Sequence, residues 1–264
     1  MSRTSYYCPR TKQIETDQLA VKQLLAVHDE HPFYGVRRLS LHLGWNQKKT
    51  RRIRILAGVV IPRPTKKRPY RSGRPEITAP VNALKPYAVF KNESRPQDGQ
   101  DYSGMVNAEA WVQDFTHLWF NHSWYYLAVV LDLKTRQVVG WRFGDNHSSE
   151  LTYSAMLDSL SKHEPPAILH SDQGSEYLSF KHELLCVKLE ITLSASDKGS
   201  PWQNGFMERW FGNFKLELGQ LNQFKDIAEV FEAIALQIHY YNAKRIHSAL
   251  KTNPVAYAKS LQKA

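Results

Sequence analysis

The sequence predicts an α/β body, in which helices flank a mixed β-sheet, preceded by a small all-α head. Three features predict this arrangement: apolar residues at helical spacing near the N-terminus, a proline-rich basic stretch after them, and short β-branched and aromatic segments that alternate with helical ones further on. We therefore place a helical head at 1–58, a proline-rich basic linker at 59–106, and the sheet with its C-terminal helices at 107–264.

Composition excludes several classes of protein. The chain has 264 residues, of which 42% are apolar and 23% are charged, as is usual for a globular protein. No apolar run approaches the ~18 residues that a membrane helix needs, and no signal peptide opens the chain. We therefore expect no membrane association and a cytoplasmic location. The two cysteines, Cys8 and Cys186, are too few for a disulfide framework or a zinc cluster.

Charge is distributed unevenly along the chain. Residues 1–75 hold 17 Lys and Arg against 4 Asp and Glu, a net +13, whereas residues 76–264 hold 18 against 21, a net −3. A basic head on a nearly neutral body predicts a polyanionic partner, and nucleic acid is the leading candidate. The alternative is that the charge serves only solubility.

The spacing of apolar residues in the head predicts three helices, at 14–30, 36–44 and 46–57, with Asn46 capping the third. A helix, a turn and a basic last helix form the usual arrangement for entering a DNA groove. The alternative is a small helical bundle with a solvated basic face. The candidate DNA-binding residues of the third helix are Lys48, Lys49, Arg51, Arg52 and Arg54.

The linker is rich in proline and in basic residues. Seven of the chain's 13 prolines lie between Pro62 and Pro96. Such a segment is extended, and Lys66, Lys67 and Arg68 are candidates for contacts with a phosphate backbone. A plain solvated spacer is the alternative.

Strands and helices follow one another in an informative order in the body. The predicted strands are 110–120, 123–133, 137–143, 167–171 and 191–195, and the predicted helices are 148–163, 179–189, 203–218, 226–242 and a short one after Pro254. The order β-β-β-α-β-α-β-α matches the ribonuclease-H-like arrangement of a mixed sheet with helices on its faces.

Three acidic residues lie where this fold could bring them together. Asp114 is in the middle of the first strand, Asp172 ends the fourth, and Glu208 lies in the first turns of the helix after the fifth. Each alone would usually be a turn or solvated residue. Together they suit phosphodiester chemistry, in which two Mg²⁺ ions held by carboxylates neutralise the attacking and leaving oxygens. Glu176 is a weaker candidate for a contact with metal-bound water, and His170 is expected to pack.

Several ordered motifs resemble a known family. They are W-V-Q-D-F-T, Y-Y-L-A-V-V-L-D-L, H-S-D-Q-G-S-E-Y, S-D-K-G-S-P-W-Q-N-G-F-M-E and Y-Y-N-A-K-R-I-H-S-A-L-K-T-N-P. The chain resembles the OrfB-type transposases of the IS-three insertion-sequence family, which share their catalytic core with retroviral integrases. The 35 residues between Asp172 and Glu208 match the family's gap, and Lys215 stands where the family has a basic residue. Gln203 departs from the Asp that many members have before the shared Asn.

The resemblance implies a transposase that cleaves the ends of its element and joins the 3′-hydroxyl to target DNA. Asp114, Asp172 and Glu208 would be catalytic and would hold two Mg²⁺ ions, with Mn²⁺ able to substitute, and Lys215 would hold a DNA phosphate. The implied partners are DNA, further copies of the chain and the product of an upstream frame, in the bacterial nucleoid. Two alternatives stay open: a non-catalytic DNA-binding regulator or decayed fragment, and a ribonuclease-H-type nuclease that only hydrolyses.

The C-terminal motif has two interpretations. Tyr241, Asn242, Arg245 and His247 fit either a helix end held by side-chain hydrogen bonds or a DNA contact.

Overall fold

The computed structural model describes residues 10–62, 79–87, 89–90, 100–101, 109–174, 176–177, 179–198 and 200–262. The chain forms two compact units. The head unit comprises the N-terminal segment as far as Arg63 together with Lys244–Asn253, and the sheet unit comprises Pro64–Ala243 together with Pro254–Ala264. No helix in the described part of the chain is long and apolar enough to cross a membrane.

The head unit contains the three expected helices, α1 (Arg10–Glu30), α2 (Val36–Leu43) and α3 (Gln47–Leu56). Helix α2 ends at Gly44, whose φ of 65° lies in the left-handed region that favours glycine. The side chain of Asn46 caps α3 by accepting a hydrogen bond of 2.8 Å from the Lys49 amide. The buried core of the unit consists of Ala20, Leu24, Tyr34, Leu39 and Ile53.

A distant segment completes the head unit. Ile246 packs against its apolar core, and the Ile246 amide donates a hydrogen bond of 2.6 Å to the hydroxyl of Tyr34. Residues more than 200 positions apart in the sequence therefore share one small core.

The sheet unit is built on a five-stranded mixed sheet in the order β5-β4-β3-β6-β7. Strands β3, β4 and β5 form an antiparallel meander, whereas β6 and β7 run parallel to β3. The strands are β3 (Ala110–Phe120), β4 (Ser123–Asp132), β5 (Val138–Gly144), β6 (Ile168–Ser171) and β7 (Thr192–Ala195). The predicted strands and their order along the chain are confirmed.

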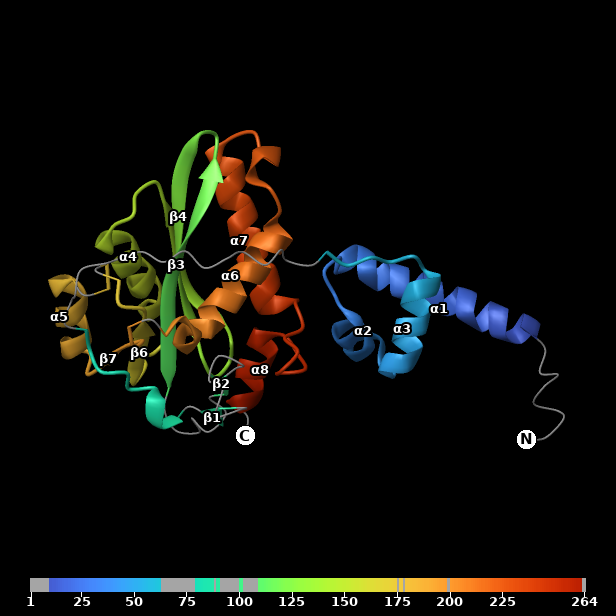
Figure 1. Cartoon of the computed structure of the whole chain (residues 1–264), viewed down its shortest axis with the longest axis horizontal. Helices are drawn as coiled ribbons and strands as arrows, with labels where there is room; N and C mark the ends of the chain where they lie inside the picture. Colours follow the sequence, from blue (N-terminus) through green and yellow to red (C-terminus); the bar gives the residue numbers. More distant parts are fainter. Residues whose placement is uncertain are drawn as a thin grey trace. The chain divides into compact units, whose positions relative to one another are not determined.

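Helices cover both faces of the sheet (Figure 1). Because side chains alternate along a strand, Trp111 faces the core beneath α4 (Ser149–Leu160) and α5 (Phe180–Lys188). Val112 faces the other core, beneath α6 (Gly205–Leu218) and α7 (Ile227–Ala243), and α8 (Pro254–Leu261) packs on α7. The ribonuclease-H-like arrangement expected from the sequence is confirmed.

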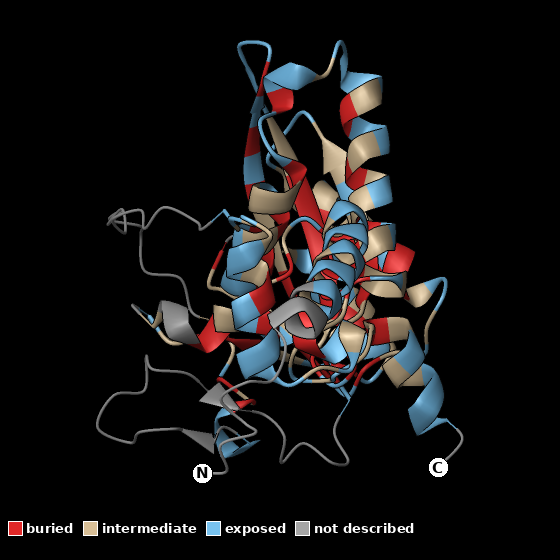
Figure 2. Cartoon of the chain, turned by 90° about the vertical axis from the view of Figure 1, so that its right-hand side faces the viewer, coloured by how far each residue is buried: buried red, intermediate tan, exposed pale blue. Residues whose placement is uncertain are grey.

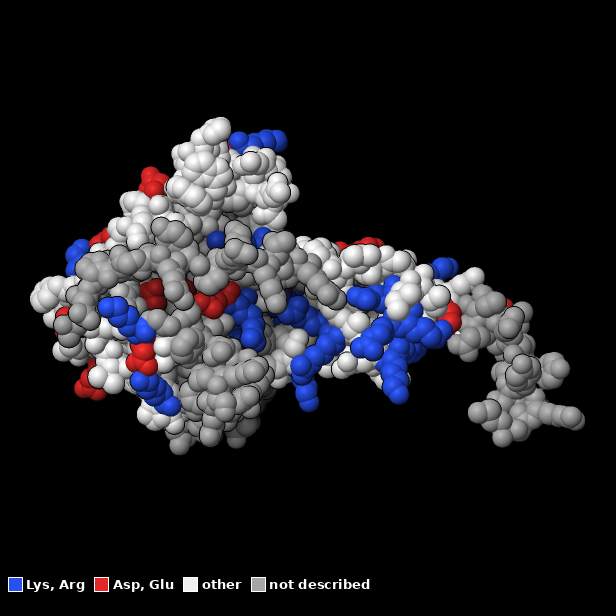
Figure 3. Space-filling model, viewed as in Figure 1, with Lys and Arg blue, Asp and Glu red and all other residues white. Residues whose placement is uncertain are grey.

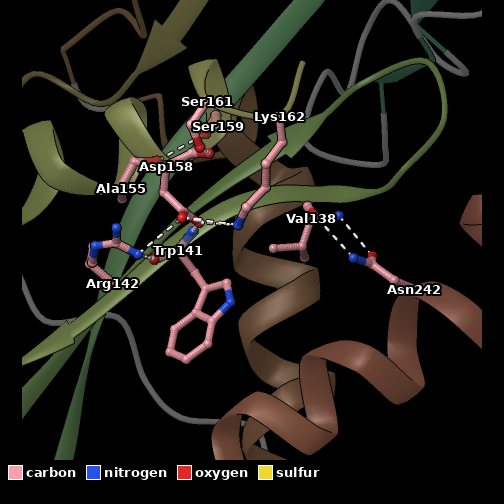
Figure 4. A network of polar contacts seen from close by, with 9 residues as sticks. All are labelled: Val138, Trp141, Arg142, Ala155, Asp158, Ser159, Ser161, Lys162 and Asn242. Atoms are coloured by element: carbon pink, nitrogen blue, oxygen red, sulfur yellow. Dashed lines mark hydrogen bonds and ion pairs between the residues drawn. The ribbon is translucent and has the colours of Figure 1, made fainter.

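Helix α4 approaches β5 very closely. A Cβ atom at Gly140 would collide with the backbone of Ala155 and Ser159, so only glycine fits there. Beside it the Asp158 carboxylate accepts hydrogen bonds from the Trp141 amide (3.2 Å) and from Lys162 Nζ (2.9 Å), as Figure 4 shows. Burial alone would raise the pKa of Asp158, but these hydrogen bonds and the nearby cations outweigh it and lower the pKa.

The proline-rich segment contributes to the packing of the sheet unit. Leu84 is fully buried in the core beneath α6 and α7, and the Ala83 amide donates to Ser194 Oγ on β7 (2.9 Å). Further along, β1 (Val89–Phe90) pairs with β2 (Gln100–Asp101) in a small antiparallel ribbon. The sequence predicted an extended linker here and gave no sign of these contacts.

Candidate active site

Asp114 and Asp172 occupy matching positions on neighbouring parallel strands. Strands β3 and β6 pair in register as far as Val112 and His170, and each acid follows two residues later. The two-residue period places both carboxylates on the sheet face that α6 covers. The adjacency predicted for them is therefore present.

Glu208 is brought to the same region by α6. The helix packs on the sheet through residues spaced three and four apart, namely Met207, Trp210, Phe211, Phe214 and Leu218. Glu208 and Lys215 lie on its exposed side, seven residues apart, and so share one face of the helix.

The carboxylates act on one another electrostatically. Burial raises the pKa of Asp114 well above its ordinary value, the charge of Asp172 adds to this, and the charges of Glu208 and Glu176 raise it further. A hydrogen bond of 2.8 Å from the Phe115 amide to the Asp114 carboxylate works in the opposite direction. Partial burial of its carboxyl group raises the pKa of Glu208 as well. A cation would relieve this conflict.

The donor set suits a hard divalent cation, because three carboxylates supply oxygen ligands without sulfur or nitrogen. Within the described residues, no group of three Asp, Glu, His or Cys side chains is arranged to hold a metal ion. The chemistry and charge of the acids fit a metal, whereas their spacing in this structure does not yet form a coordination shell.

The loop after Asp172 is tightly built. The Gly174 amide donates a hydrogen bond of 2.9 Å to Asp172 Oδ1. A Cβ at Gly174 would collide with the carboxylate of Glu176, which is buried and lies 3.5 Å from His147 Nε2. The glycine therefore makes room for a neighbouring acid.

Two buried histidines support the strands beneath the acids. His170 contacts the hydroxyls of Ser194 (2.8 Å) and Ser196 (3.0 Å), as expected of a packing residue, and burial lowers its pKa to about 4. His182 on α5 contacts the Gln113 amide group at 3.1 Å, and burial lowers its pKa to about 4 too.

Gln203 organises the loop before α6. Its carbonyl oxygen accepts from the Asp197 amide (2.6 Å) and from Asn82 (2.7 Å), and its amide nitrogen donates to the Asp197 carboxylate (2.8 Å). An Asp could not make this set of bonds, because it lacks the amide donor. The departure from the family pattern thus has a structural reason, and the buried Asn82 that it depends on could not be recognised from the sequence.

The C-terminal motif holds the end of α7. Tyr241 donates to the Arg136 carbonyl (2.9 Å), Asn242 bonds the backbone of Val138, and Arg245 is buried. These contacts match the structural interpretation of the motif.

The proposed DNA-contacting residues differ in their surroundings. On α3, Lys48 and Arg51 are exposed, whereas Lys49 lies over the Trp45 ring. Arg52 makes an ion pair with Asp17 on α1. Lys66, Lys67 and Arg68 lie outside the described residues. Figure 3 shows Lys and Arg gathered on the visible face of the head unit, but the role of these residues stays a prediction.

Comparisons with known proteins identify the family of the chain. Two family models, both described as an integrase core domain, match residues 107–201 and 189–254. The putative transposase InsK of insertion element IS150 from Escherichia coli is 32% identical, and the match covers 87% of this chain and 79% of that protein. The chain belongs to the IS3-type insertion-sequence transposases. The transposase of IS904 from Lactococcus lactis is 26% identical, with 92% of this chain and 93% of that protein covered.

The fold of the transposase also has a structural counterpart. A chain in the cryo-electron microscopy structure of a simian T-cell lymphotropic virus intasome, in complex with the PP2A regulatory subunit B56 gamma, aligns with a TM-score of 0.51. The alignment covers 89% of the transposase and 73% of that chain at 17% identity, and it shows a shared fold.

Proposed function

We propose that this transposase cleaves DNA at the ends of its insertion sequence and joins the freed 3′-hydroxyl to target DNA. The observation that supports this most strongly is the matching position of Asp114 and Asp172, each two residues beyond the pairing of β3 with β6, with Glu208 acting on Asp114 from α6. A buried carboxylate beside the negative charges of two others is costly unless it serves a cation-dependent reaction.

The proposed chemistry has two phosphoryl-transfer steps. In the first, water attacks phosphorus at the element's end, and the bond to the 3′ oxygen breaks to leave a 3′-hydroxyl. In the second, that hydroxyl loses its proton and attacks a target phosphodiester, so that one P–O bond forms as another breaks. Each step conserves the number of P–O bonds, so neither an external energy source nor a covalent protein intermediate is needed.

Asp114, Asp172 and Glu208 would hold the metal ions, which we propose to be two Mg²⁺, replaceable by Mn²⁺. When bound, such ions neutralise the charge on the attacking and leaving oxygens. The strands β3 and β6 fix the first two carboxylates, and α6 supplies the third from its exposed side. Lys215 would bind a phosphate further along that side.

DNA would be bound by the basic residues of both units. We assign contacts with the element ends to five residues of α3, namely Lys48, Lys49, Arg51, Arg52 and Arg54. Of these, Arg52 also forms an ion pair with Asp17. Lys66, Lys67 and Arg68 would follow the phosphate backbone. We further propose self-association, pairing with the product of an upstream frame, and a location in the bacterial nucleoid.

A strand-transfer assay tests the proposal. The full chain is incubated with a labelled duplex that carries the element's own terminal repeat, plus a target plasmid, with Mg²⁺ or with EDTA. We expect nicked ends and joined products with Mg²⁺ only. Shortened strands without joined products would instead identify a hydrolytic nuclease, and DNA binding without any cleavage would identify a regulator.

A further inference from the structure

The strands β3 and β4 extend beyond the rest of the sheet as a two-stranded arm, which we define as residues 117–126. Strand β6 pairs with β3 only at 110–112, and β5 pairs with β4 only as far as Tyr126. The arm turns through Asn121 and His122, whose positive φ values of 44° and 63° form a tight hairpin. Its tip is exposed, as Figure 2 shows.

The two faces of the arm differ sharply. Leu118 and Phe120 on one face are buried in the core beneath α6 and α7. On the other face Trp119 is 45% exposed and Trp124 is 51% exposed, and His117 beside them is exposed as well. Large aromatic side chains left in water on one face of a small hairpin indicate an interaction surface.

The rings on the open face form a continuous track. Centroids lie 4.8 Å apart for Trp119 and Trp124, 5.9 Å for Trp124 and His117, and 5.1 Å for His117 and Tyr126. The track continues from Tyr126 to His147 at 5.5 Å. These five rings define the aromatic track.

The track ends near the candidate active site, on the sheet face opposite to the Asp114 carboxylate. His147 lies 4.3 Å from the ring of Phe115, the residue next to Asp114, and 3.5 Å from the Glu176 carboxylate. The charge of Glu176 acts in turn on Asp114.

The arm carries no negative charge that would repel an anionic ligand. Residues 117–126 (HLWFNHSWYY) contain no Asp or Glu and two histidines, and Figure 3 shows the tip of the arm as uncharged surface. Unpaired nucleobases stack on such aromatic side chains whatever their sequence. A duplex keeps its base faces covered and offers no comparable surface.

We propose that the aromatic track binds a single-stranded segment of DNA by base stacking, near the candidate active site. This inference rests on the proposed function, because it assigns the frayed strand at an element end or target as the ligand. The track thus supplies a second DNA contact that depends on unpaired bases and not on net positive charge.

The test measures binding of the full chain to a fluorescent 20-nucleotide single strand, in EDTA, by anisotropy. We expect Trp124→Ala and Trp119→Ala each to raise Kd about 5- to 150-fold, the range for loss of one stacked base. Trp124→Phe should restore most of the affinity, because it keeps a ring. Phe180→Ala is the matched control, since Phe180 is an aromatic residue on α5 that is 76% exposed and outside the track.

Two further measurements distinguish base stacking from phosphate binding and from self-association. The salt dependence of single-strand binding should keep its slope in the Trp variants, because no phosphate contact is lost. Affinity for a blunt duplex should change less than affinity for the single strand. Unchanged single-strand affinity in both Ala variants overturns the proposal, and so does a change confined to the sedimentation coefficient, which would identify a self-association surface. Because the assay needs no catalysis, it gives its answer even where strand transfer fails.

Discussion

The side chain of Asn242 pairs with Val138 as a neighbouring strand would. Its carbonyl oxygen accepts from the Val138 amide at 2.9 Å, and its amide nitrogen donates to the Val138 carbonyl at 2.8 Å. Strand β5 is an edge strand, so these backbone groups have no strand partner on that side. One side chain at the end of α7 therefore forms hydrogen bonds with the backbone amide and carbonyl at the start of β5 and attaches the helix to the sheet.

We predict that Asn242→Ala lowers the free energy of unfolding by about 1–3 kcal/mol, because it leaves two backbone groups without their partner. Chemical denaturation followed by circular dichroism measures the change. Asn222→Ala, at an exposed position between α6 and α7, serves as the control and should be nearly neutral. Equal stabilities for the two variants would show that water replaces the Asn242 bonds without cost.

Asp172→Asn should abolish cleavage and strand transfer while DNA binding persists. The amide keeps the shape of the carboxylate but loses the charge that would hold Mg²⁺. Asp114→Asn and Glu208→Gln should behave alike, whereas Asp145→Asn, at an exposed position, should retain activity. Substantial Mg²⁺-dependent product from any of the three acid variants removes that residue from the proposed site.

Replacing both Lys48 and Arg51 with Gln should weaken binding to element ends and flatten its salt dependence. Each phosphate contact on duplex DNA contributes about −0.9 to the slope of log K against log salt concentration. Arg52→Gln is the comparison, because Arg52 is already paired with Asp17 and its loss should lower the stability of the head unit more than the slope. An unchanged slope in the double variant would indicate that the basic charge of the head serves only solubility.

Lys215→Ala should weaken end binding and strand transfer but leave metal binding nearly unchanged. Lys215 follows Glu208 by about 10.5 Å along the helix, which is too far for a shared metal ion and suitable for the next phosphate. Lys215→Arg should be milder, because a positive charge is retained there. Lys225→Ala is the control, at an exposed position where Lys225 pairs with Glu229. If Lys215→Ala matches that control, the assignment fails at this residue.

Stability should fall as the pH decreases from about 6.5 to about 4. Burial lowers the pKa of His182 to about 4, so the folded state keeps the neutral ring. Above pH 6.5 both states are neutral and the contribution is complete. Below pH 6.5 the unfolded chain binds a proton at His182 that the folded chain does not bind. This difference lowers the free energy of unfolding by up to about 3 kcal/mol at pH 4. His182→Gln should remove this part of the decline, whereas His239→Gln, at an exposed position, should not.

The main elements of both units were predictable because each carries a local signal. The β-branched and aromatic composition of 110–120 marked the central strand, and Asn46 and Gly44 marked helix ends through their own capping chemistry. The order of strands then placed Asp114 beside Asp172, because sequential connections leave few ways to build such a sheet.

What the sequence could not predict depends on contacts between distant residues. Leu84 and Asn82 are buried, although they belong to a stretch whose prolines and charges predict an extended chain. Their burial depends on contacts of this stretch with Ser194 on β7 and with Gln203 before α6. The exposure of Ile55 and Leu56 on α3 could not be predicted for a similar reason. Periodicity shows which side of a helix is apolar, but not how much of that side neighbouring elements cover. The roles of the acids and of Lys215 stay predictions.

The sharing of one core by Tyr34 and Ile246 has a consequence for biosynthesis. About 180 residues separate Arg63 from Lys244, and translation at roughly 5–20 residues per second needs about 10–40 seconds to cover them. The three helices of the head therefore emerge from the ribosome well before the segment that completes their core. A nascent chain cut short within that interval carries an unfinished head, so premature termination yields a protein that is impaired at its N-terminus as well as its C-terminus.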